Sequence, residues 1–416
     1  MPTAVGPNIK GEENLAFGYD LSDTRNSFKG KPATNILKVL NSQYSDYNQT
    51  YFKVTNGTHI VDIPTLGPRT VKYIDVWNDY YGGSGNCCLG LFTFGTSITV
   101  TGGTDYMYQI IYKTDTGYTD TNYMYHYEYG ASGYLTEYGL HSTSRRTHLG
   151  DGWYHAWGGF TTNASATYTN TYLFHYEYAT LNRIQVAGVM LTQGTQVIPP
   201  DQFIGFEQTR SVTQGLLDLT GNLTIDLTNV SFDSNAQMTF DDTNDYIQLA
   251  SNGTGTVFET QTFTIETVIY PTVDPDSSES VIWSYDYTSH SNTYYSQHLR
   301  LGGSSGLSNE LGFYWNNGSA DKGMTIGNVI PTLNVHYHIV ATYQSGYQAV
   351  YVNGELLNST TEVGTITYYN QEVWISRSNF GGYFGGDIPL LKFYNRALTA
   401  SEVKSNFNAI KGRFNI

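Results

Sequence analysis

Five consecutive residues, Asp241-Asp242-Thr243-Asn244-Asp245, bring together three carboxylates and two other side-chain oxygens. Calcium binds about six to eight oxygen ligands, so Asp241, Asp242 and Asp245 are candidate ligands for part of a calcium site. The alternative is an acidic turn in which Asp and Asn side chains accept hydrogen bonds from their own backbone. The sequence indicates no other cofactor.

Aromatic side chains in the first half of the chain have the chemistry of a sugar platform, because the C–H faces of pyranose rings stack on exposed aromatic rings. Trp153, His155 and Trp157 alternate along a strand and would share one of its faces. Trp153 and Trp157, together with Tyr125 and Tyr127, are therefore the candidate glycan-binding residues. The alternative is that one of the two Trp side chains lies in the core, which sandwiches commonly require; the spacing does not decide, and the core is favoured.

Tyrosine is unusually abundant, with 37 residues, and a dense run of it exceeds what a core of this size needs. Tyrosine offers a large contact area at low entropic cost, with a hydroxyl for hydrogen bonding. The run therefore indicates an adhesive surface for a neighbouring subunit or a host glycan, with subunit contact favoured. A cross-strand ladder that only stabilises the sheet is the alternative. The run comprises Tyr118, Tyr123, Tyr125, Tyr127, Tyr129, Tyr134 and Tyr138.

The motifs of catalysis are missing from the sequence. A retaining glycosidase needs two carboxylates about 5 Å apart, which on one strand requires acidic residues at alternating positions. No Glu-x-Asp-x-Glu string occurs, and Glu266 stands alone in its strand. Neither a Gly-x-Ser-x-Gly elbow nor a Walker loop is present. We therefore predict that the protein is not an enzyme, although a carboxylate pair assembled from distant strands would escape this search.

The elements that must position these residues are strands. Charged residues make up 14% of the 416 and aromatic residues 15%, so the chain can bury enough surface to fold. Tyr, Thr, Asn and Gly predominate, which favours strands joined by tight turns and an all-β fold. The net charge of −15 disfavours a nucleic-acid partner, and no apolar run reaches the ~20 residues that span a bilayer. We predict neither a nucleic-acid nor a membrane partner.

Composition divides the chain into three segments. Residues 1–40 predict an extended N-terminal arm, with a disordered leader as the alternative. Residues 41–200 contain short alternating runs separated by turn clusters, which predict a β-sandwich. Pro199-Pro200 ends a strand, and residues 201–416 predict a second β-sandwich. The apolar residues of the arm show no sustained period and are its candidate anchoring residues: Leu15, Phe17, Tyr19 and Phe28.

Two local patterns are specific enough to fix individual elements. The strands at 338–343 and 347–352 form a predicted hairpin, followed by an Asn353-Gly354 turn of type I′. Thr399 and Glu402 predict a capping box that begins a C-terminal helix, which we expect to end at Gly412.

Residues from about 205 to 416 resemble the laminin-G-like, concanavalin A-like jelly rolls. The stretches that carry the resemblance are LDLTGN at 217–222, FDDTNDYI at 240–247, FTIE at 263–266, HYHIVATY at 336–343, VYVNG at 350–354 and YNRALTASEV at 394–403. The resemblance implies a jelly-roll domain. It also implies an acidic turn at 241–245 even where no metal is bound, so the turn is favoured over the calcium site.

The segment 41–200 resembles a carbohydrate-binding-module-like sandwich, through DGWYHAW at 151–157 and IQVAGVML at 184–191. The whole arrangement, including YDLSDT at 19–24 and GKPATN at 30–35, is similar to virion structural proteins of tailed bacteriophages, in particular phages of marine bacteria such as cyanobacteria. That similarity implies a location at the virion surface.

These observations predict a non-enzymatic structural protein of the virion: a capsid decoration, head fibre or tail-fibre module. The arm would anchor it to other virion proteins of the capsid or tail, and its two jelly-roll-like sandwiches would face outward with a host-adhesion role toward surface glycans. A homotrimer is expected by analogy alone. The alternatives are a free lectin-like polysaccharide-binding protein and a polysaccharide depolymerase.

Overall fold

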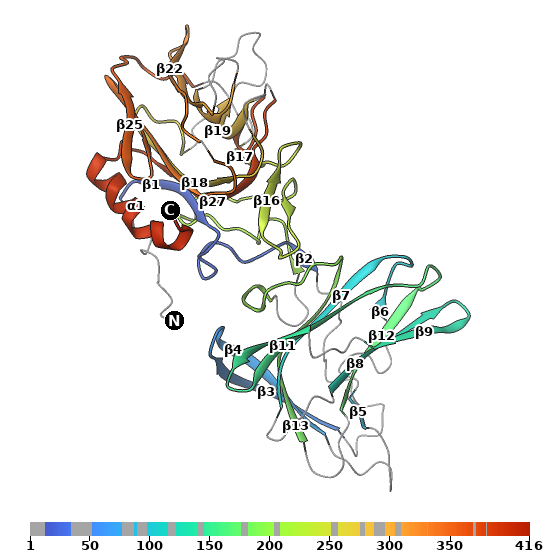
Figure 1. Ribbon diagram of the computed structural model, residues 1–416. Helices are drawn as coiled ribbons and strands as arrows, with labels where there is room; N and C mark the ends of the chain where they lie inside the picture. Colours follow the sequence, from blue (N-terminus) through green and yellow to red (C-terminus); the bar gives the residue numbers. More distant parts are fainter. Residues whose placement is uncertain are drawn as a thin grey trace. The chain divides into compact units, whose positions relative to one another are not determined.

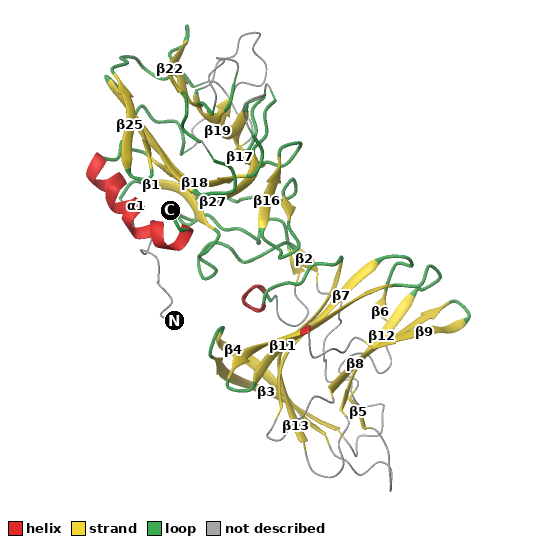
Figure 2. Cartoon of the chain, in the orientation of Figure 1, coloured by secondary structure: helices red, strands yellow, loops and turns green. Residues whose placement is uncertain are grey.

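The computed structural model describes residues 13–34, 52–76, 87–89, 98–114, 122–139, 145–175, 182–203, 209–250, 257–274, 279–286, 296–303, 309–330, 332–368, 372–379 and 381–416. Their secondary structure is dominated by strands, with one α-helix near the C-terminus (Figures 1 and 2). The predicted all-β fold with a short C-terminal helix is confirmed. No helix in the described part of the chain has the length and hydropathy needed to cross a bilayer.

The chain folds into two compact units, one of them interrupted in sequence by the other. The discontinuous unit comprises Met1–Lys31, Val212–Asp233 and Gln237–Ile416. The inserted unit comprises Pro32–Ser211 with Ser234–Ala236. The expected boundaries after residues 40 and 200 therefore differ from those of the structure, in which residues 13–31 belong with the C-terminal half.

Two antiparallel sheets build the discontinuous unit. The larger sheet follows the order β15 (Ser231–Phe232), β16 (Met238–Asp241), β27 (Gly385–Tyr394), β18 (Phe263–Pro271), β23 (Tyr337–Gln344), β24 (Tyr347–Val352) and β25 (Glu355–Thr360), and β1 (Leu15–Asp20) also pairs with β27. The smaller sheet follows the order β17 (Ile247–Ala250), β26 (Glu372–Ile375), β19 (Ser280–Asp286), β20 (Gln297–Leu301), β21 (Leu311–Asn316) and β22 (Asp321–Ile326).

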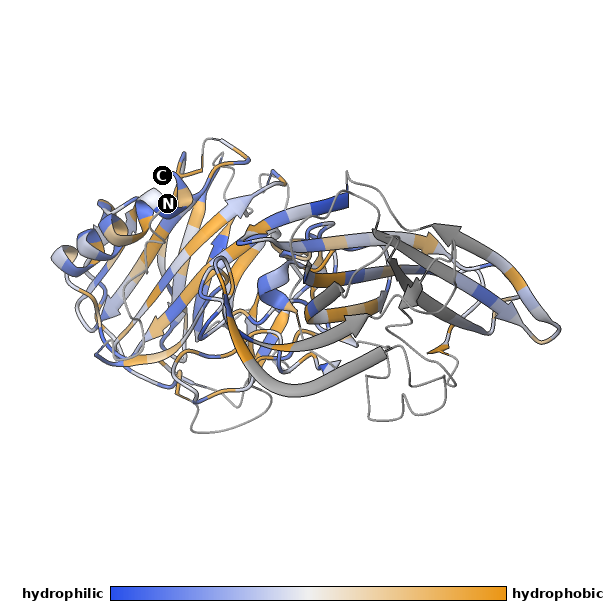
Figure 3. Ribbon diagram, turned by 90° about the horizontal axis from the view of Figure 1, so that it is seen from below, coloured by the Kyte–Doolittle hydropathy of each residue, from blue (hydrophilic) through white to orange (hydrophobic). Residues whose placement is uncertain are grey.

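Alternating side chains fix which face of each sheet is buried. In Figure 3, hydrophobic and hydrophilic residues alternate along the strands of this unit. Leu299 and Leu301 of β20, with Phe313 of β21, point into the core between the sheets. Because successive residues of a strand point to opposite faces, His298 and Arg300 of β20 lie on the other face of the smaller sheet. The core thereby determines which polar side chains share that face.

The N-terminal segment is a strand of the larger sheet where an arm was expected. β1 pairs with β27 from Leu15↔Tyr394 to Asp20↔Leu390, and in Figure 1 it lies among the C-terminal strands. Phe17 and Tyr19 are completely buried in the core, and Phe28 is 1% exposed. Leu15 is half-buried and packs against a cluster beneath the helix. The four residues expected to anchor the chain to another protein therefore pack within their own unit.

Helix α1 (Ala400–Phe414) covers the outer face of the larger sheet. Thr399 accepts a hydrogen bond from the Glu402 backbone N–H, and the Glu402 carboxylate accepts one from the Thr399 N–H, which confirms the capping box. The helix buries Val403, Phe407, Ile410 and Phe414. Its expected end at Gly412 is wrong, because the left-handed residue that terminates it is Asn415, with φ of 56°.

The inserted unit is a second sandwich. One sheet follows the order β10 (Arg146–Gly150), β11 (Trp153–Thr161), β7 (Asp105–Thr114), β13 (Asn182–Gln193), β4 (Gly67–Val76) and β3 (Phe52–Ile63). The other follows β5 (Cys87–Leu89), β12 (Tyr168–His175), β8 (Asn122–Gly130) and β9 (Gly133–Gly139), with β6 (Ile98–Thr99) also on β12. One apolar cluster, which includes Tyr108, Ile110 and Leu191, lies between the sheets.

A second apolar cluster covers the outer face of the six-stranded sheet of the inserted unit. It contains Trp153, Ile111 and Met190, and it is closed by Ile198 and Phe203, which flank a short 3-10 helix (Pro200–Gln202). The expected domain boundary at Pro199-Pro200 therefore lies within this unit. Its two ends meet in a small ladder, where β2 (Ala33–Thr34) pairs with β14 (Thr209–Arg210).

Candidate functional site

A row of polar and aromatic side chains crosses the non-core face of the smaller sheet in the discontinuous unit. Gln248, Trp374, Ser284, His298 and Tyr314 stand directly opposite one another on five neighbouring strands, from β17 to β21. Directly opposed residues of antiparallel strands share a face and lie about 5 Å apart. The five side chains therefore form one continuous line, which we call the polar row.

Two adjacent members of the polar row carry buried donors without a hydrogen-bond partner. The Ser284 hydroxyl and the Trp374 indole N–H are both unsatisfied, although the residues are 0% and 1% exposed. Burying such a group without a partner costs about 1–3 kcal/mol, so each one requires an explanation. The two unsatisfied groups lie on directly opposed residues of neighbouring strands.

The core-facing tryptophans of the same sheet differ from Trp374. The indole N–H of Trp283 donates to Gln297 Oε1 at 3.3 Å, and that of Trp315 donates to Gln348 Oε1 at 3.2 Å. Both indole N–H groups that face the core therefore have a glutamine oxygen as their acceptor. Trp374, on the other face, has none.

One end of the polar row is bordered by a charged cluster around Arg300. Its guanidinium contacts Glu310 at 2.6 Å and Glu279 at 3.3 Å, and it donates to the Tyr314 hydroxyl at 3.2 Å. Burial raises the pKa of the Glu279 carboxyl. Burial, followed by the charge of Arg300, lowers the pKa of His298 well below its usual value, so that this imidazole is neutral at pH 7. His298 therefore adds no positive charge to the row.

Residues 241–404 match the sequence model of the Concanavalin A-like lectin/glucanases superfamily. This match covers less than half of the chain and supports a concanavalin A-like jelly roll for the C-terminal part of the discontinuous unit. A comparison with curated proteins finds no match.

Several solved structures share part of the fold. The receptor binding domain of botulinum neurotoxin type G is 17% identical over 47% of this chain and 48% of its own, with a TM-score of 0.35. A heptameric pentraxin from Limulus polyphemus is 19% identical over 40% of this chain and 78% of its own, with a TM-score of 0.30. The sialidase of Trypanosoma rangeli is 18% identical over 46% and 30%, with a TM-score of 0.35. The chain thus spans about half of the neurotoxin domain, and with TM-scores this low none of these similarities supports a function.

The four residues predicted to bind glycan lie in the inserted unit and do not form one platform. Trp153 is 1% exposed in the outer apolar cluster, and Trp157 is half-buried beside His155 on that same face of β11. Tyr127 lies on β8 of the other sheet, with its ring 6.4 Å from that of Tyr134. The side chain of Tyr125 lies outside the described residues. Trp153 therefore serves the core, and Trp157 and Tyr127 belong to different sheets of the sandwich.

The described tyrosines of the dense run form a cross-strand ladder. The rings of Tyr129 and Tyr168 are stacked at 4.9 Å with an interplanar angle of 2°, on directly opposed positions of β8 and β12. Tyr134 approaches Tyr129 edge-on at 6.0 Å and is 56% exposed. Because Tyr129 and Tyr168 stack on each other, their facing surfaces are occupied and their pairing stabilises the sheet.

One carboxylate oxygen of Asp241 in the acidic turn at 241–245 accepts hydrogen bonds from the turn's own backbone. Asp241 Oδ1 accepts the backbone N–H groups of Thr243, Asn244 and Asp245, at 2.9 to 3.2 Å. These bonds lower the pKa of Asp241, whereas burial raises the pKa of Asp242 and of Asp245. The structure does not bring the three carboxylates together as metal ligands, and no group of three His, Cys, Asp or Glu residues in the described ranges is arranged to hold a metal ion.

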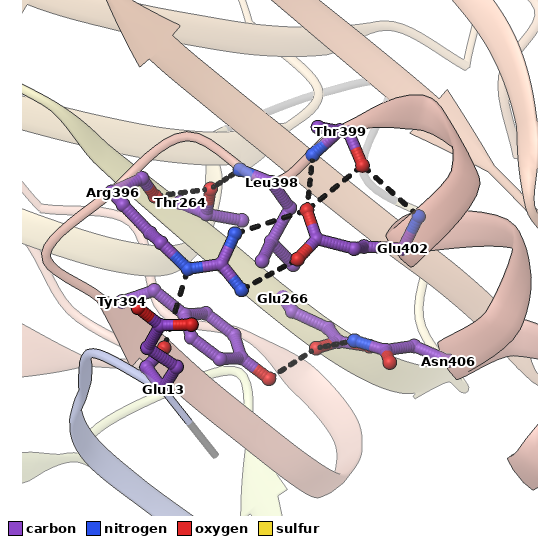
Figure 4. A network of polar contacts seen from close by, with 9 residues as sticks. All are labelled: Glu13, Thr264, Glu266, Tyr394, Arg396, Leu398, Thr399, Glu402 and Asn406. Atoms are coloured by element: carbon purple, nitrogen blue, oxygen red, sulfur yellow. Dashed lines mark hydrogen bonds and ion pairs between the residues drawn. The ribbon is translucent and has the colours of Figure 1, made fainter.

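Glu266, which stands alone in sequence, is the centre of a buried network beneath helix α1. Its carboxylate accepts hydrogen bonds from Tyr394 and Asn406 at 3.0 Å (Figure 4). It also contacts His338 Nε2 at 2.9 Å and Lys392 Nζ at 3.8 Å. Burial alone would raise its pKa, but Lys392 and His338 outweigh burial and lower the pKa to about 2. A fully buried carboxylate held by four partners joins the helix to the sheet and offers nothing to a substrate.

The polar row cannot be recognised in the sequence, because each of its five members comes from a different strand. The only local signal is the alternation in β20, where His298 and Arg300 interrupt Leu299 and Leu301. The row can be identified only once the order of the strands and the register between them are known.

Proposed function

We propose that the protein binds carbohydrate at the polar row of its jelly roll. The observation that carries the proposal is the adjacent pair of buried, unsatisfied donors, Ser284 Oγ and Trp374 Nε1. Sugar hydroxyl oxygens accept hydrogen bonds from such groups. The match of residues 241–404 to a superfamily of lectins and glucanases supports the same class of ligand.

Binding is proposed without hydrolysis. No member of the polar row is a carboxylate, and glycosidases need an acidic pair about 5–9 Å apart across the scissile bond. The nearest acids at the border of the row, Glu310 and Glu279, are both held by Arg300. A carboxylate that neutralises a guanidinium is poorly suited to donate or accept the proton of a leaving group.

Access to the row requires a local opening, because Ser284 and Trp374 are buried. Association that waits for such an opening is slower than simple docking. We expect an association rate constant below about 10⁵ M⁻¹ s⁻¹.

We further propose that this activity is displayed at the surface of a tailed-phage particle, where it contributes to host adhesion. The support is the similarity of YDLSDT at 19–24 and GKPATN at 30–35 to virion proteins. Because Phe17, Tyr19 and Phe28 fill the core of the jelly roll, other residues would attach the protein to its neighbours. Mass spectrometry and cryo-electron microscopy of purified particles test this location and the number of copies in each assembly. Absence from the particle would favour a free lectin.

A glycan array probed with the full-length chain tests carbohydrate binding, followed by calorimetry on the best ligand. Trp374→Phe removes the unsatisfied N–H and keeps an aromatic ring, so we expect about tenfold weaker binding, as for the loss of one hydrogen bond of about 1.4 kcal/mol. Tyr347→Phe, on the larger sheet, is the matched control and should bind normally. An array without hits would overturn the proposal.

A further inference from the structure

The guanidinium of Arg377 contacts two aromatic rings at the edge of the polar row. Its guanidinium carbon lies 4.6 Å from the ring centre of Tyr246 and 4.8 Å from that of Trp374, the residue with the unsatisfied N–H. Such cation–π contacts do not use the N–H donors of the guanidinium. These donors are the part that can bind a ligand.

The backbone before Arg377 is fixed in an uncommon conformation. Ser376, which follows the last residue of β26, has φ of 67° and is completely buried. Its hydroxyl donates to the Asp245 carbonyl at 2.9 Å and accepts the Phe384 N–H at 3.0 Å. A non-glycine residue in the left-handed region costs about 1 kcal/mol or more, and such strain gathers at functional sites. Here it turns the chain so that Arg377 stacks on Trp374.

The charge of Arg377 is not neutralised by an ion pair, in contrast to the charges of three other arginines of the jelly roll. Arg300, Arg396 and Arg413 each form an ion pair with a carboxylate at 2.6 to 2.7 Å. Among the described residues, Arg377 forms no ion pair within 4.0 Å, and its guanidinium contacts the rings of Tyr246 and Trp374. Burial raises the pKa of Glu372, and the charge of Arg377 opposes part of that rise.

The acidic turn nearby does not take the place of that missing anion. Oδ1 of Asp241 accepts three backbone N–H groups, and Asp245 Oδ1 accepts the Ser231 hydroxyl at 3.1 Å, whereas Asp245 Oδ2 is buried without a hydrogen-bond partner. At physiological ionic strength the Debye length is about 8 Å, so the net charge of −15 acts weakly on a ligand that touches the guanidinium. The charge of a ligand that binds here is therefore determined by its direct contact with the Arg377 guanidinium.

We propose that Arg377 binds the carboxylate of an acidic sugar, so that the polar row selects glycans carrying uronic or sialic acid. A guanidinium edge matches a planar carboxylate with two parallel hydrogen bonds. The N–H of Trp374 and the hydroxyl of Ser284 then serve the ring oxygen and hydroxyl groups of the same sugar. This inference rests on the proposed carbohydrate binding and adds the ligand's charge to it.

Calorimetry with the full-length chain and matched ligands tests the inference. The ligands are trigalacturonate, 3′-sialyllactose, the carboxyl-reduced form of the first and lactose. We expect at least one acid to bind about tenfold or more tightly than its neutral partner, because a hydrogen bond to a charged group contributes about 1.5–3 kcal/mol. Binding of trigalacturonate would indicate recognition of uronic acid, and binding of 3′-sialyllactose would indicate recognition of sialic acid.

Two variants and one control attribute the selectivity to Arg377. Arg377→Gln should reduce the ratio of acidic to neutral affinity about tenfold, whereas Arg377→Lys, which keeps the charge without the planar fork, should fall between. Arg25→Gln removes one exposed positive charge elsewhere in the unit and should change nothing. Circular dichroism establishes that each variant is folded.

The outcomes separate this inference from the function on which it rests. Equal affinity for acidic and neutral ligands would overturn the role of Arg377 and leave carbohydrate binding intact. Acid selectivity that survives Arg377→Gln would also overturn it. No binding of any glycan on the array would overturn both.

Discussion

At the scale of single residues, the protein treats similar buried groups in different ways. Trp283 and Trp374 are both buried on neighbouring strands of one sheet, β19 and β26. One indole N–H has a glutamine acceptor and the other has none. The N–H of Trp283 is hydrogen-bonded within the protein, whereas the N–H of Trp374 is left for a ligand in the proposed binding site.

This contrast predicts a difference in stability between two otherwise equal substitutions. Trp283→Phe and Trp374→Phe remove the same volume, but only the first also breaks a hydrogen bond. We expect Trp283→Phe to lower the free energy of unfolding by about 1 kcal/mol more than Trp374→Phe does. Urea denaturation of the two variants measures the difference. A larger loss for Trp374→Phe would mean that its N–H is already satisfied within the folded chain.

The buried carboxylate beneath helix α1 predicts a dependence of stability on pH. The pKa of Glu266 is lowered from 4.5 to about 2 in the folded protein, so the unfolded chain takes up this proton first as the pH falls. The contribution of Glu266 is therefore complete above about pH 4.5 and is lost between there and pH 2. Urea unfolding at pH 7 and at about pH 3.5 should show this loss.

Glu266→Gln isolates that contribution. Without the carboxylate, Lys392 stays buried with its charge uncompensated, so we expect a loss of about 3–5 kcal/mol at pH 7. The variant should also lose less stability on acidification than the natural chain does. Glu402→Gln, at the exposed start of the helix, serves as a comparison, since its pKa is also lowered to about 2, chiefly by Arg396. Identical pH profiles for the natural chain and Glu266→Gln would contradict the assignment.

At the scale of elements, local signals predicted local structure. The Asn353-Gly354 turn, with φ of 51° and 74°, follows the predicted hairpin, and the Thr399 capping box begins α1. Each of these depends on residues within a few positions of one another. Strand β1 depends on β27, more than 350 residues away, and its short apolar pattern carries no information about that partner. The polar row was missed for the same reason.

The position of β1 gives a prediction opposite to that of an arm. Phe17 lies 5.8 Å from Phe258 and 6.5 Å from Trp283, ring centre to ring centre, in the middle of the core. Phe17→Ala should therefore cost about 3–5 kcal/mol of stability. Val363→Ala, at a residue 73% exposed, is the control and should change it by less than about 0.5 kcal/mol. An unchanged midpoint of thermal unfolding in Phe17→Ala would instead support the prediction that residues 1–40 form an arm.

At the scale of the whole molecule, the order of the chain differs from the order of its domains. The jelly roll begins with β1, stops at Lys31 and resumes at Val212. Within the inserted unit, Thr34 stands directly opposite Thr209, so the chain enters and leaves that unit at one place. Phe28 likewise forms a bridge with Leu216 in the jelly roll. A domain whose ends meet in this way is suited to insertion into another.

This arrangement predicts that the jelly roll folds without the inserted sandwich. Replacing residues 35–208 by Asn-Gly would join β2 to β14 through a two-residue turn of type I′, which suits directly opposed strand ends. Because the core of the jelly roll contains no residue from 35–208, we expect the shortened chain to unfold cooperatively and to keep the glycan affinity of the full-length protein. Calorimetry measures both. A shortened chain that folds but no longer binds would move the binding site to the inserted unit, whereas one that fails to fold would show that the jelly roll depends on the insertion.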